Sequence, residues 1–178
     1  DIQLINSPIL SSEPDAKDIY NDILKIIKEN YDINNGTLVL YGYSWGGQLL
    51  MEFLKFFKQS GIKIKLLVTV DSARGFASFA VNTTLENNVK YNLNMYQTNP
   101  SSIGSHGNAN YGIGVKNVNL TYEKNSKNEN ITHSNIDEYT LLYAAQVIIY
   151  ALKNNFSFHD LSEMEIKTQI AIYASQGF

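Results

Sequence analysis

The chain has no cysteine among its 178 residues. This absence excludes disulfides, thiolate catalysis and cysteine-ligated metals in this chain. Positive charge is also sparse, since 14 basic residues, including the single arginine Arg74, stand against 17 acidic ones. Nucleic-acid surfaces need clustered basic side chains, and no such cluster is visible, so no nucleic-acid partner is expected. No apolar run approaches the roughly 20 residues of a membrane-spanning helix, so no transmembrane segment is expected either.

What is present indicates a single globular domain, 1–178. The composition, 44% hydrophobic and 17% charged, is that of a folded protein with a substantial core. Apolar patterns predict an alternation of strands at 2–9, 37–41 and 62–70 with helices at 13–30 and 46–57. Strands that alternate with helices favour right-handed parallel crossovers, so we expect an α/β fold.

The second half of the chain is less regular in pattern. Alternating residues predict strands at 88–98 and 115–123, separated by a polar, glycine-rich loop. Helices are expected at about 136–152 and 161–173. Asn135, or the serine before it, is expected to cap the first of these helices.

The segment Gly42-Tyr43-Ser44-Trp45-Gly46 matches the Gly-x-Ser-x-Gly pattern of a nucleophile elbow between a strand and a helix. In such a turn the serine is strained, and the glycines let strand and helix approach closely. Ser44 Oγ would project above the carboxyl edge of the sheet, with the Trp45 N–H beside a developing oxyanion. A phosphate loop is disfavoured, because the dinucleotide pattern needs glycine at position 44 and no Gly-Lys-Ser/Thr occurs. A merely structural turn is the remaining alternative.

A serine hydroxyl needs a histidine base and an acid that orients the base. The chain has three histidines. His133 follows the last expected strand and directly precedes a helix, which is where a hydrolase base belongs, so it is the preferred candidate. His106, in the glycine-rich loop, and His159, near the end of the chain, are the alternatives.

Asp71 is the preferred acid, because it ends the strand that follows the elbow helix and so shares the sheet edge with Ser44. An aspartate at this position is also a common turn former. Asp137 is expected to stabilise the N-terminus of its helix instead. The order Ser44, Asp71, His133 matches the nucleophile, acid, base order of α/β-hydrolases.

Taken together, four segments resemble bacterial lipase- or esterase-like α/β-hydrolases. They are LVLYGYSWGGQLL (38–50), LLVTVDS (66–72), NVKYNLNMYQT (88–98) and ITHSNID (131–137). The resemblance covers about residues 37 to 140 and rests on the occurrence of all four segments in this order. It implies a mostly parallel sheet flanked by helices, with Ser44 as nucleophile, Asp71 as acid and His133 as base.

The resemblance also implies cleavage of a carboxylic ester, from a small molecule or a lipid, through an acyl-enzyme without metal or organic cofactor. Tyr43, Phe76, Phe79 and Tyr111 are the candidate residues for binding the substrate, with ordinary packing as the alternative. The full fold has a further strand and loop before the first strand seen here, and that loop supplies a second oxyanion donor. Either those residues are missing upstream, or the loop at 6–8 substitutes, or the oxyanion hole is incomplete.

Two other functions fit the same residues. One is a non-catalytic binding protein that keeps the α/β-hydrolase fold and the elbow but lacks a working oxyanion hole. The other is an acyltransferase or amidase that uses the same three residues. Labelling by an active-site serine probe separates the first from an enzyme, and assays with different esters and acceptors separate the second.

Overall fold

A computed structural model describes residues 16–31, 36–74, 81–99, 106–153 and 158–176. Contacts divide the chain into two compact units, residues 1–36 and 37–178, and each is considered by itself. The single-domain organisation therefore stays a prediction. In the described ranges, no helix has the length and apolar character needed to cross a bilayer.

The first unit contains one described helix, α1 (Ala16–Asn30). Asp18 lies in its first turn and Lys28 in its last, so each charge opposes the partial charge of its helix end. The observed bounds agree with the helix expected at 13–30 over the described part. The strand expected at 2–9 lies outside the described residues.

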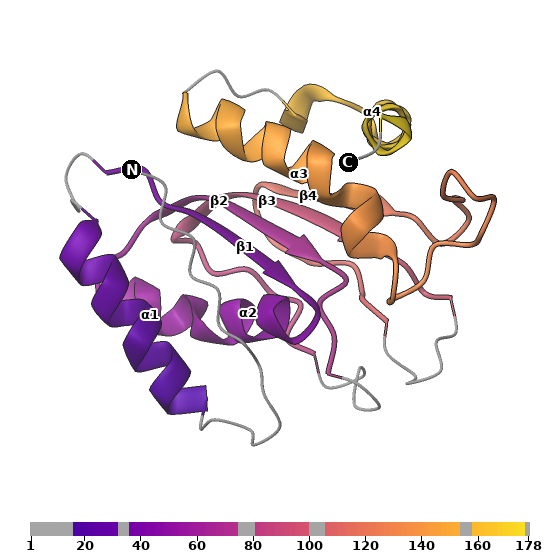
Figure 1. Cartoon of the computed structure of the whole chain (residues 1–178). Coiled ribbons are helices and arrows are strands. Elements are labelled where there is room, and N and C mark those ends of the chain that lie inside the picture. The colour runs from indigo at the N-terminus through magenta and orange to yellow at the C-terminus, as the bar shows by residue number, and fades with distance from the viewer. Residues whose placement is uncertain (1–15, 32–35, 75–80, 100–105, 154–157, 177–178) are drawn as a thin grey trace. The chain divides into compact units, whose positions relative to one another are not determined.

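The second unit is built on a parallel sheet of four strands in the order β1-β2-β3-β4 (Figure 1). The strands are β1 (Val39–Tyr43), β2 (Ile64–Val70), β3 (Val89–Tyr96) and β4 (Val115–Asn119). All neighbouring strands pair in parallel. The prediction of an α/β fold with parallel strands is therefore confirmed for this unit. The carboxyl ends of the four strands consequently meet at one edge of the sheet.

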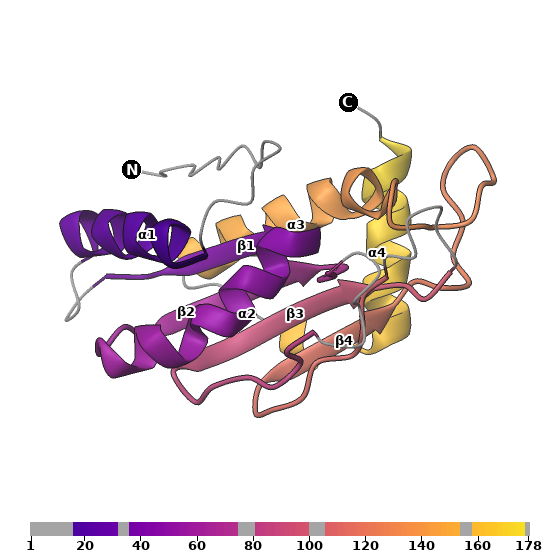
Figure 2. The same ribbon diagram turned by 90° about the horizontal axis from the view of Figure 1, so that it is seen from below.

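The register aligns the last residues of neighbouring strands along this edge. Tyr43 pairs with Val70, and Val70 pairs in turn with Met95. Ser44 follows β1 directly and Asp71 follows β2 directly, so the two residues leave adjacent strands at the same level. Figure 2 shows the four strands side by side, with α2 in front of them.

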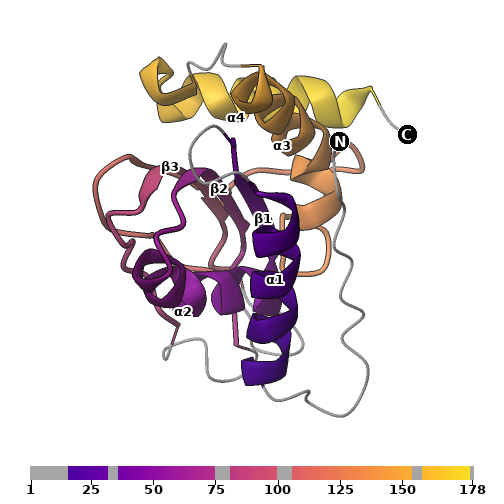
Figure 3. The ribbon, with the colours of Figure 1, turned by 90° about the vertical axis from the view of Figure 1, so that its left-hand side faces the viewer.

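Helices cover both faces of the sheet. Helix α2 (Ser44–Gln59) contacts β1 and β2 on one face. Helices α3 (Ile136–Leu152) and α4 (Glu163–Ser175), joined through the short 3-10 helix η2 (Phe158–Asp160), cover the opposite face (Figure 3). The unit thus has three layers, and helices flank the sheet as expected of an α/β protein.

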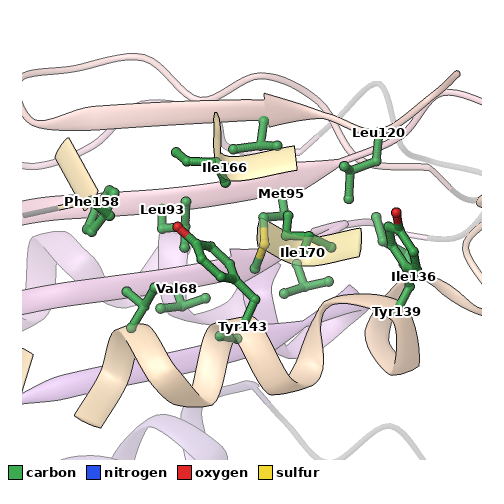
Figure 4. Packing of buried hydrophobic residues seen from close by; sticks show 14 of the residues in the cluster. Val68, Leu93, Met95, Leu120, Ile136, Tyr139, Tyr143, Phe158, Ile166 and Ile170 are labelled. Carbon is green, nitrogen blue, oxygen red and sulfur yellow. The ribbon is translucent and has the colours of Figure 1, made fainter. Parts of the chain in front are cut away.

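The largest apolar cluster lies between the sheet and the α3–α4 pair (Figure 4). Val68, Leu93 and Met95 point into it from the strands, and Ile136 and Tyr143 from α3. On β3, Leu93 and Met95 alternate with the polar residues Asn92 and Asn94, which is the two-residue period expected of a strand with two covered faces. The cluster fixes α3, and with it the turn that precedes α3.

The face toward α2 carries a buried amide cluster between β2, β3 and β4. Thr69 Oγ1 donates to Asn94 Oδ1 at 2.9 Å, and Asn92 Nδ2 donates to Thr69 Oγ1 at 3.2 Å. Asn94 Nδ2 donates to Asn117 Oδ1 at 2.8 Å, and Asn110 Nδ2 to Asn92 Oδ1 at 3.0 Å. Buried amides are stable only when paired, and here they pair with one another. The cluster binds the segment around Asn110 to the sheet.

The starts of α3 and α4 are capped differently. Asn135 occupies the N-cap of α3, but its side chain makes no capping bond and instead accepts from the Thr132 N–H at 2.8 Å. This bond shapes the turn that holds His133. Ser162, by contrast, forms a capping box with Glu165 at the start of α4.

Candidate active site

Ser44 lies at the junction of β1 and α2, with no residue between strand and helix. Its φ of 54° falls in the left-handed region, which an L-residue other than glycine enters at a cost of about 1 kcal/mol or more. The side chain of a residue with this φ points away from the axes of both the strand and the helix. The serine therefore occupies the strained turn that the sequence pattern predicts.

The close approach of strand and helix depends on Gly42 and Gly47. A Cβ on Gly42 would lie 2.7 Å from the Gly47 backbone, and a Cβ on Gly47 would lie 2.3 Å from Ser72 Oγ. A Cβ on Gly46 would meet no atom within 4 Å. The expectation that Gly46 permits the approach is thus wrong, because position 47 rather than 46 faces β1 on the helix.

His133 lies in the turn directly before α3 and is buried. Its Nε2 is 2.8 Å from Ser44 Oγ, which is hydrogen-bond distance. Its Nδ1 is 2.7 Å from Asp71 Oδ2. Since an ionised carboxylate can only accept, Nδ1 carries the proton and Nε2 is left free to accept from the Ser44 hydroxyl.

Asp71 is fully buried at the carboxyl end of β2, and its φ of 44° is also left-handed. Besides His133, three donors hold its carboxylate. The N–H groups of Gly107 and Gln97 donate to Oδ1 at 2.6 and 3.1 Å, and Gln97 Nε2 donates to Oδ2 at 2.8 Å. Both oxygens of the carboxylate are therefore hydrogen-bonded although the side chain is buried.

Gly107 has a steric reason to be glycine. A Cβ at this position would lie 2.6 Å from Asp71 Oδ1 and 2.9 Å from the Cβ of Tyr96. Only a residue without a side chain brings its backbone N–H so close to the acid. Neither Gly107 nor Gln97 was predicted as part of the site, although Gln97 lies in a segment that carries the family resemblance.

Tyr43 contacts His133. Its hydroxyl donates to the backbone carbonyl of His133, and its ring stacks on the imidazole with centroids 5.3 Å apart and planes 26° apart. Burial, followed by the negative charges of Asp137 and Asp71, raises the pKa of Tyr43 above its ordinary value. The phenol therefore remains a donor over the working pH range and supports the His133 turn. The expected role of Tyr43 in binding substrate stays a prediction.

Trp45 is the second residue of α2 and half-buried. Its backbone N–H belongs to the first turn, where helix amides lack intrahelical partners. The Ser44 carbonyl accepts from the Ala73 N–H at 3.1 Å, which joins the elbow to the segment after Asp71. The helix N-terminus beside Ser44 is thus a place where negative charge is stabilised.

Two of the remaining candidates, Tyr111 and His159, do not contact this group among the described residues. Tyr111 exchanges backbone hydrogen bonds with Thr83 and Leu85 in the segment before β3, and its side chain is exposed. His159 packs against Tyr91 and Phe158. The other candidates are treated separately below.

His106 precedes Gly107, and its Nδ1 lies 2.9 Å from the Gly107 carbonyl. Asp137 lies in the first turn of α3, as expected. Phe76 and Phe79, and the loop at 6–8, lie outside the described residues. Within the described part of the chain, no group of three or more histidine, aspartate or glutamate side chains is arranged to hold a metal ion.

Comparison with known proteins gave no match, either to a protein-family model, to a curated protein or to a solved structure. The function of the site has to be argued from its own geometry and chemistry.

Proposed function

We propose that this chain is a serine hydrolase of the α/β-hydrolase type that cleaves a carboxylic ester through an acyl-enzyme. The observation that carries the proposal is the pair of hydrogen bonds on His133. Ser44 Oγ lies 2.8 Å from Nε2, and Asp71 Oδ2 lies 2.7 Å from Nδ1. A hydroxyl, an imidazole and a buried carboxylate in this order support nucleophilic catalysis.

The chemistry follows from these contacts. As Ser44 Oγ attacks the ester carbonyl carbon, its proton passes to His133 Nε2, and the imidazolium is stabilised by Asp71. The tetrahedral intermediate collapses with cleavage of the carbon–oxygen bond, and the alcohol leaves with the proton from Nε2. Water then attacks the acyl-serine, again with His133 as base, and releases the carboxylic acid and free Ser44.

The oxyanion of the intermediate needs donors that are already in place. The Trp45 N–H, in the first turn of α2, is the proposed donor next to the nucleophile. In the preorganised setting of a helix N-terminus, one such donor is worth on the order of 100- to 1000-fold in turnover. The mechanism requires no cofactor, and the proposed substrate is a small-molecule or lipid ester.

Labelling with a fluorophosphonate probe tests the proposal directly, because such probes phosphonylate an activated serine. The intact chain should be labelled at Ser44, and Ser44→Ala should abolish labelling. His133→Ala should slow labelling by about 1000-fold or more, since the base is lost. Ser175→Ala, at the far end of α4, is the control and should be labelled like the wild type.

An unlabelled but folded wild-type chain would contradict the proposal and favour a binding protein that keeps the elbow. If labelling occurs at Ser44, p-nitrophenyl esters of increasing chain length identify the preferred acyl group. Turnover that depends on an added alcohol or amine acceptor would indicate acyl transfer instead of hydrolysis.

A further inference from the structure

The side chain of Gln97 lies between the acid and the segment that carries the base. Gln97 follows β3 directly and is fully buried. Its Nε2 donates at 2.8 Å to Asp71 Oδ2, the same oxygen that accepts from His133 Nδ1 at 2.7 Å. The amide thus shares one carboxylate oxygen with the imidazole.

The other end of the same amide is bonded toward His133. Gln97 Oε1 accepts from the Asn99 N–H at 2.6 Å. Asn99 Nδ2 in turn donates to the carbonyl of Ile131 at 2.7 Å and to that of Thr121 at 2.6 Å. Ile131 is fully buried and precedes His133 by two residues. Hydrogen bonds therefore lead from the acid through Gln97 and Asn99 to the base-bearing segment.

This arrangement has a chemical consequence for the carboxylate. The backbone N–H groups of Gln97 and Gly107 both donate to Oδ1, so they leave Oδ2 to the Gln97 side chain and the imidazole. Without the amide, Oδ2 would be held by His133 alone, and its negative charge would act on the imidazole without a competing donor. The carboxylate would also be freer to turn away from Nδ1.

We infer that Gln97 is a positioning residue, which orients the Asp71 carboxylate and, through Asn99, couples it to the segment that carries His133. The inference rests on the proposed hydrolase function. Gln97 touches no reacting atom, so its effect reaches Ser44 through Asp71 and His133. Its role is geometric and electrostatic, because a buried amide with both ends bonded has a single allowed orientation.

The other titratable groups on the elements around the site stay unchanged in the test below. Tyr43 stacks on the His133 imidazole from β1, and Asp137 in the first turn of α3 acts on the Tyr43 phenol. His106 adjoins Gly107 on the acid side. The nearest guanidinium along the chain, Arg74, forms an ion pair with Glu52 of α2 at 3.6 Å.

The test measures the rate of fluorophosphonate labelling at Ser44 between pH 5 and 9. Labelling rises with pH as the imidazolium loses its proton. Gln97→Met keeps a side chain of similar length but removes the donor to Oδ2. We expect its rate constant to fall about 10- to 100-fold, as for a misplaced catalytic group. We also expect the midpoint of its pH profile to rise by about half a unit or more, because the less compensated carboxylate stabilises the imidazolium.

Asn88→Leu is the matched control. Asn88 is also an amide whose Nδ2 bonds two backbone carbonyls, those of Leu54 and Ile62, but it lies at the amino end of β3. Its loss should lower the free energy of unfolding without moving the pH midpoint. If Gln97→Met does not fold, Gln97→Leu takes its place, because it also removes the donor to Oδ2, and it should move the midpoint in the same direction.

Three outcomes are distinguishable. A folded wild-type chain that is not labelled contradicts the hydrolase itself. A labelled wild type with an unchanged rate and midpoint in folded Gln97→Met, or in Gln97→Leu where the first variant does not fold, overturns the role of Gln97. An equal midpoint shift in Asn88→Leu also overturns it, because a general loss of stability would then explain the effect.

Discussion

Ser44 and Asp71 both adopt left-handed backbone conformations, with φ values of 54° and 44°. They bind opposite nitrogens of one imidazole, Ser44 at Nε2 and Asp71 at Nδ1. Strain of this kind persists only where the surrounding structure imposes it, and it concentrates at functional sites. Its presence on both sides of His133 is thus what a catalytic arrangement predicts, and it has a measurable effect on stability.

Substitutions at Ser44 should reverse the usual order of alanine and glycine. In an ordinary helix, alanine is more stabilising than glycine, but at a positive φ the alanine Cβ is strained. We expect the free energy of unfolding of Ser44→Gly to be about 1 kcal/mol higher than that of Ser44→Ala. Urea denaturation of the two variants, both unable to react with a serine probe, measures the difference. An alanine variant as stable as the glycine variant would refute strain at this turn.

At the scale of single residues, the sequence predicts the serine of the strand–helix turn better than its surroundings. A serine between glycines at a strand–helix junction has few physical explanations, so Ser44 could be identified from its local pattern. Gln97 and Gly107 could not, because their roles depend on Asp71, which approaches them only after β2 and β3 pair. Tyr43 was expected to bind substrate, whereas its observed contacts are with His133.

At the scale of elements, the junction of β1 and α2 gives two adjacent glycines different surroundings. Gly47 faces the strand, with no room for a Cβ, and Gly46 faces open space. Successive helical residues point about 100° apart, so neighbours on one helix have different surroundings. The motif alone places glycine at position 46, but packing requires it at position 47.

Gly46→Ala and Gly47→Ala should therefore have opposite effects on stability. Alanine at position 46 gains helix propensity, so the free energy of unfolding should stay equal or rise by up to about 1 kcal/mol. Alanine at position 47 would collide with Ser72 and with the Gly42 carbonyl, and overpacking of this kind costs about 1–3 kcal/mol. Thermal unfolding followed by circular dichroism compares the two. Equal stability of both variants would contradict the packing described for this junction.

Most elements were predictable because they follow a hydrophobic period. The strand expected at 62–70 is observed as β2 and is buried almost throughout, and the helix expected at 46–57 begins two residues earlier, at Ser44. The start of α3 was less predictable, since Asn135 bonds Thr132 instead of capping the helix. Local side-chain bonds of this kind depend on the turn before the helix rather than on the helix pattern.

At the scale of the whole molecule, the apolar layer under α3 contains one polar atom without a described partner. The hydroxyl of Tyr143 is buried and has no hydrogen-bond partner among the described residues. Burial, followed by the charge of Tyr173, raises the pKa of Tyr143 from 10.0 to about 12. The folded chain therefore holds this proton more tightly than the unfolded chain does.

Tyr143→Phe should raise the free energy of unfolding and make it decrease less at alkaline pH. The pKa of Tyr143 is higher in the folded chain than in the unfolded chain. The stability that the neutral Tyr143 phenol contributes is therefore complete below pH 10 and is lost as pH rises through about 12. At pH 7 the variant should gain about 1 kcal/mol by losing an unpaired buried hydroxyl. Urea titrations at pH 7, 9 and 11 test this, with the exposed Tyr122→Phe as control. A loss of stability at pH 7 would mean that the hydroxyl has a partner.

The parallel sheet has a consequence for how the protein reaches its active form. Each ladder joins segments more than 20 residues apart, such as Tyr43 with Val70 and Tyr96 with Asn119, so no hairpin can nucleate it. Sheets with such distant contacts close their loops late and fold slowly. His133 follows all four strands along the chain. Under the proposed function, a polypeptide emerging from a ribosome therefore carries Ser44 long before the base that would activate it. Reactivity would then report that synthesis and folding are complete.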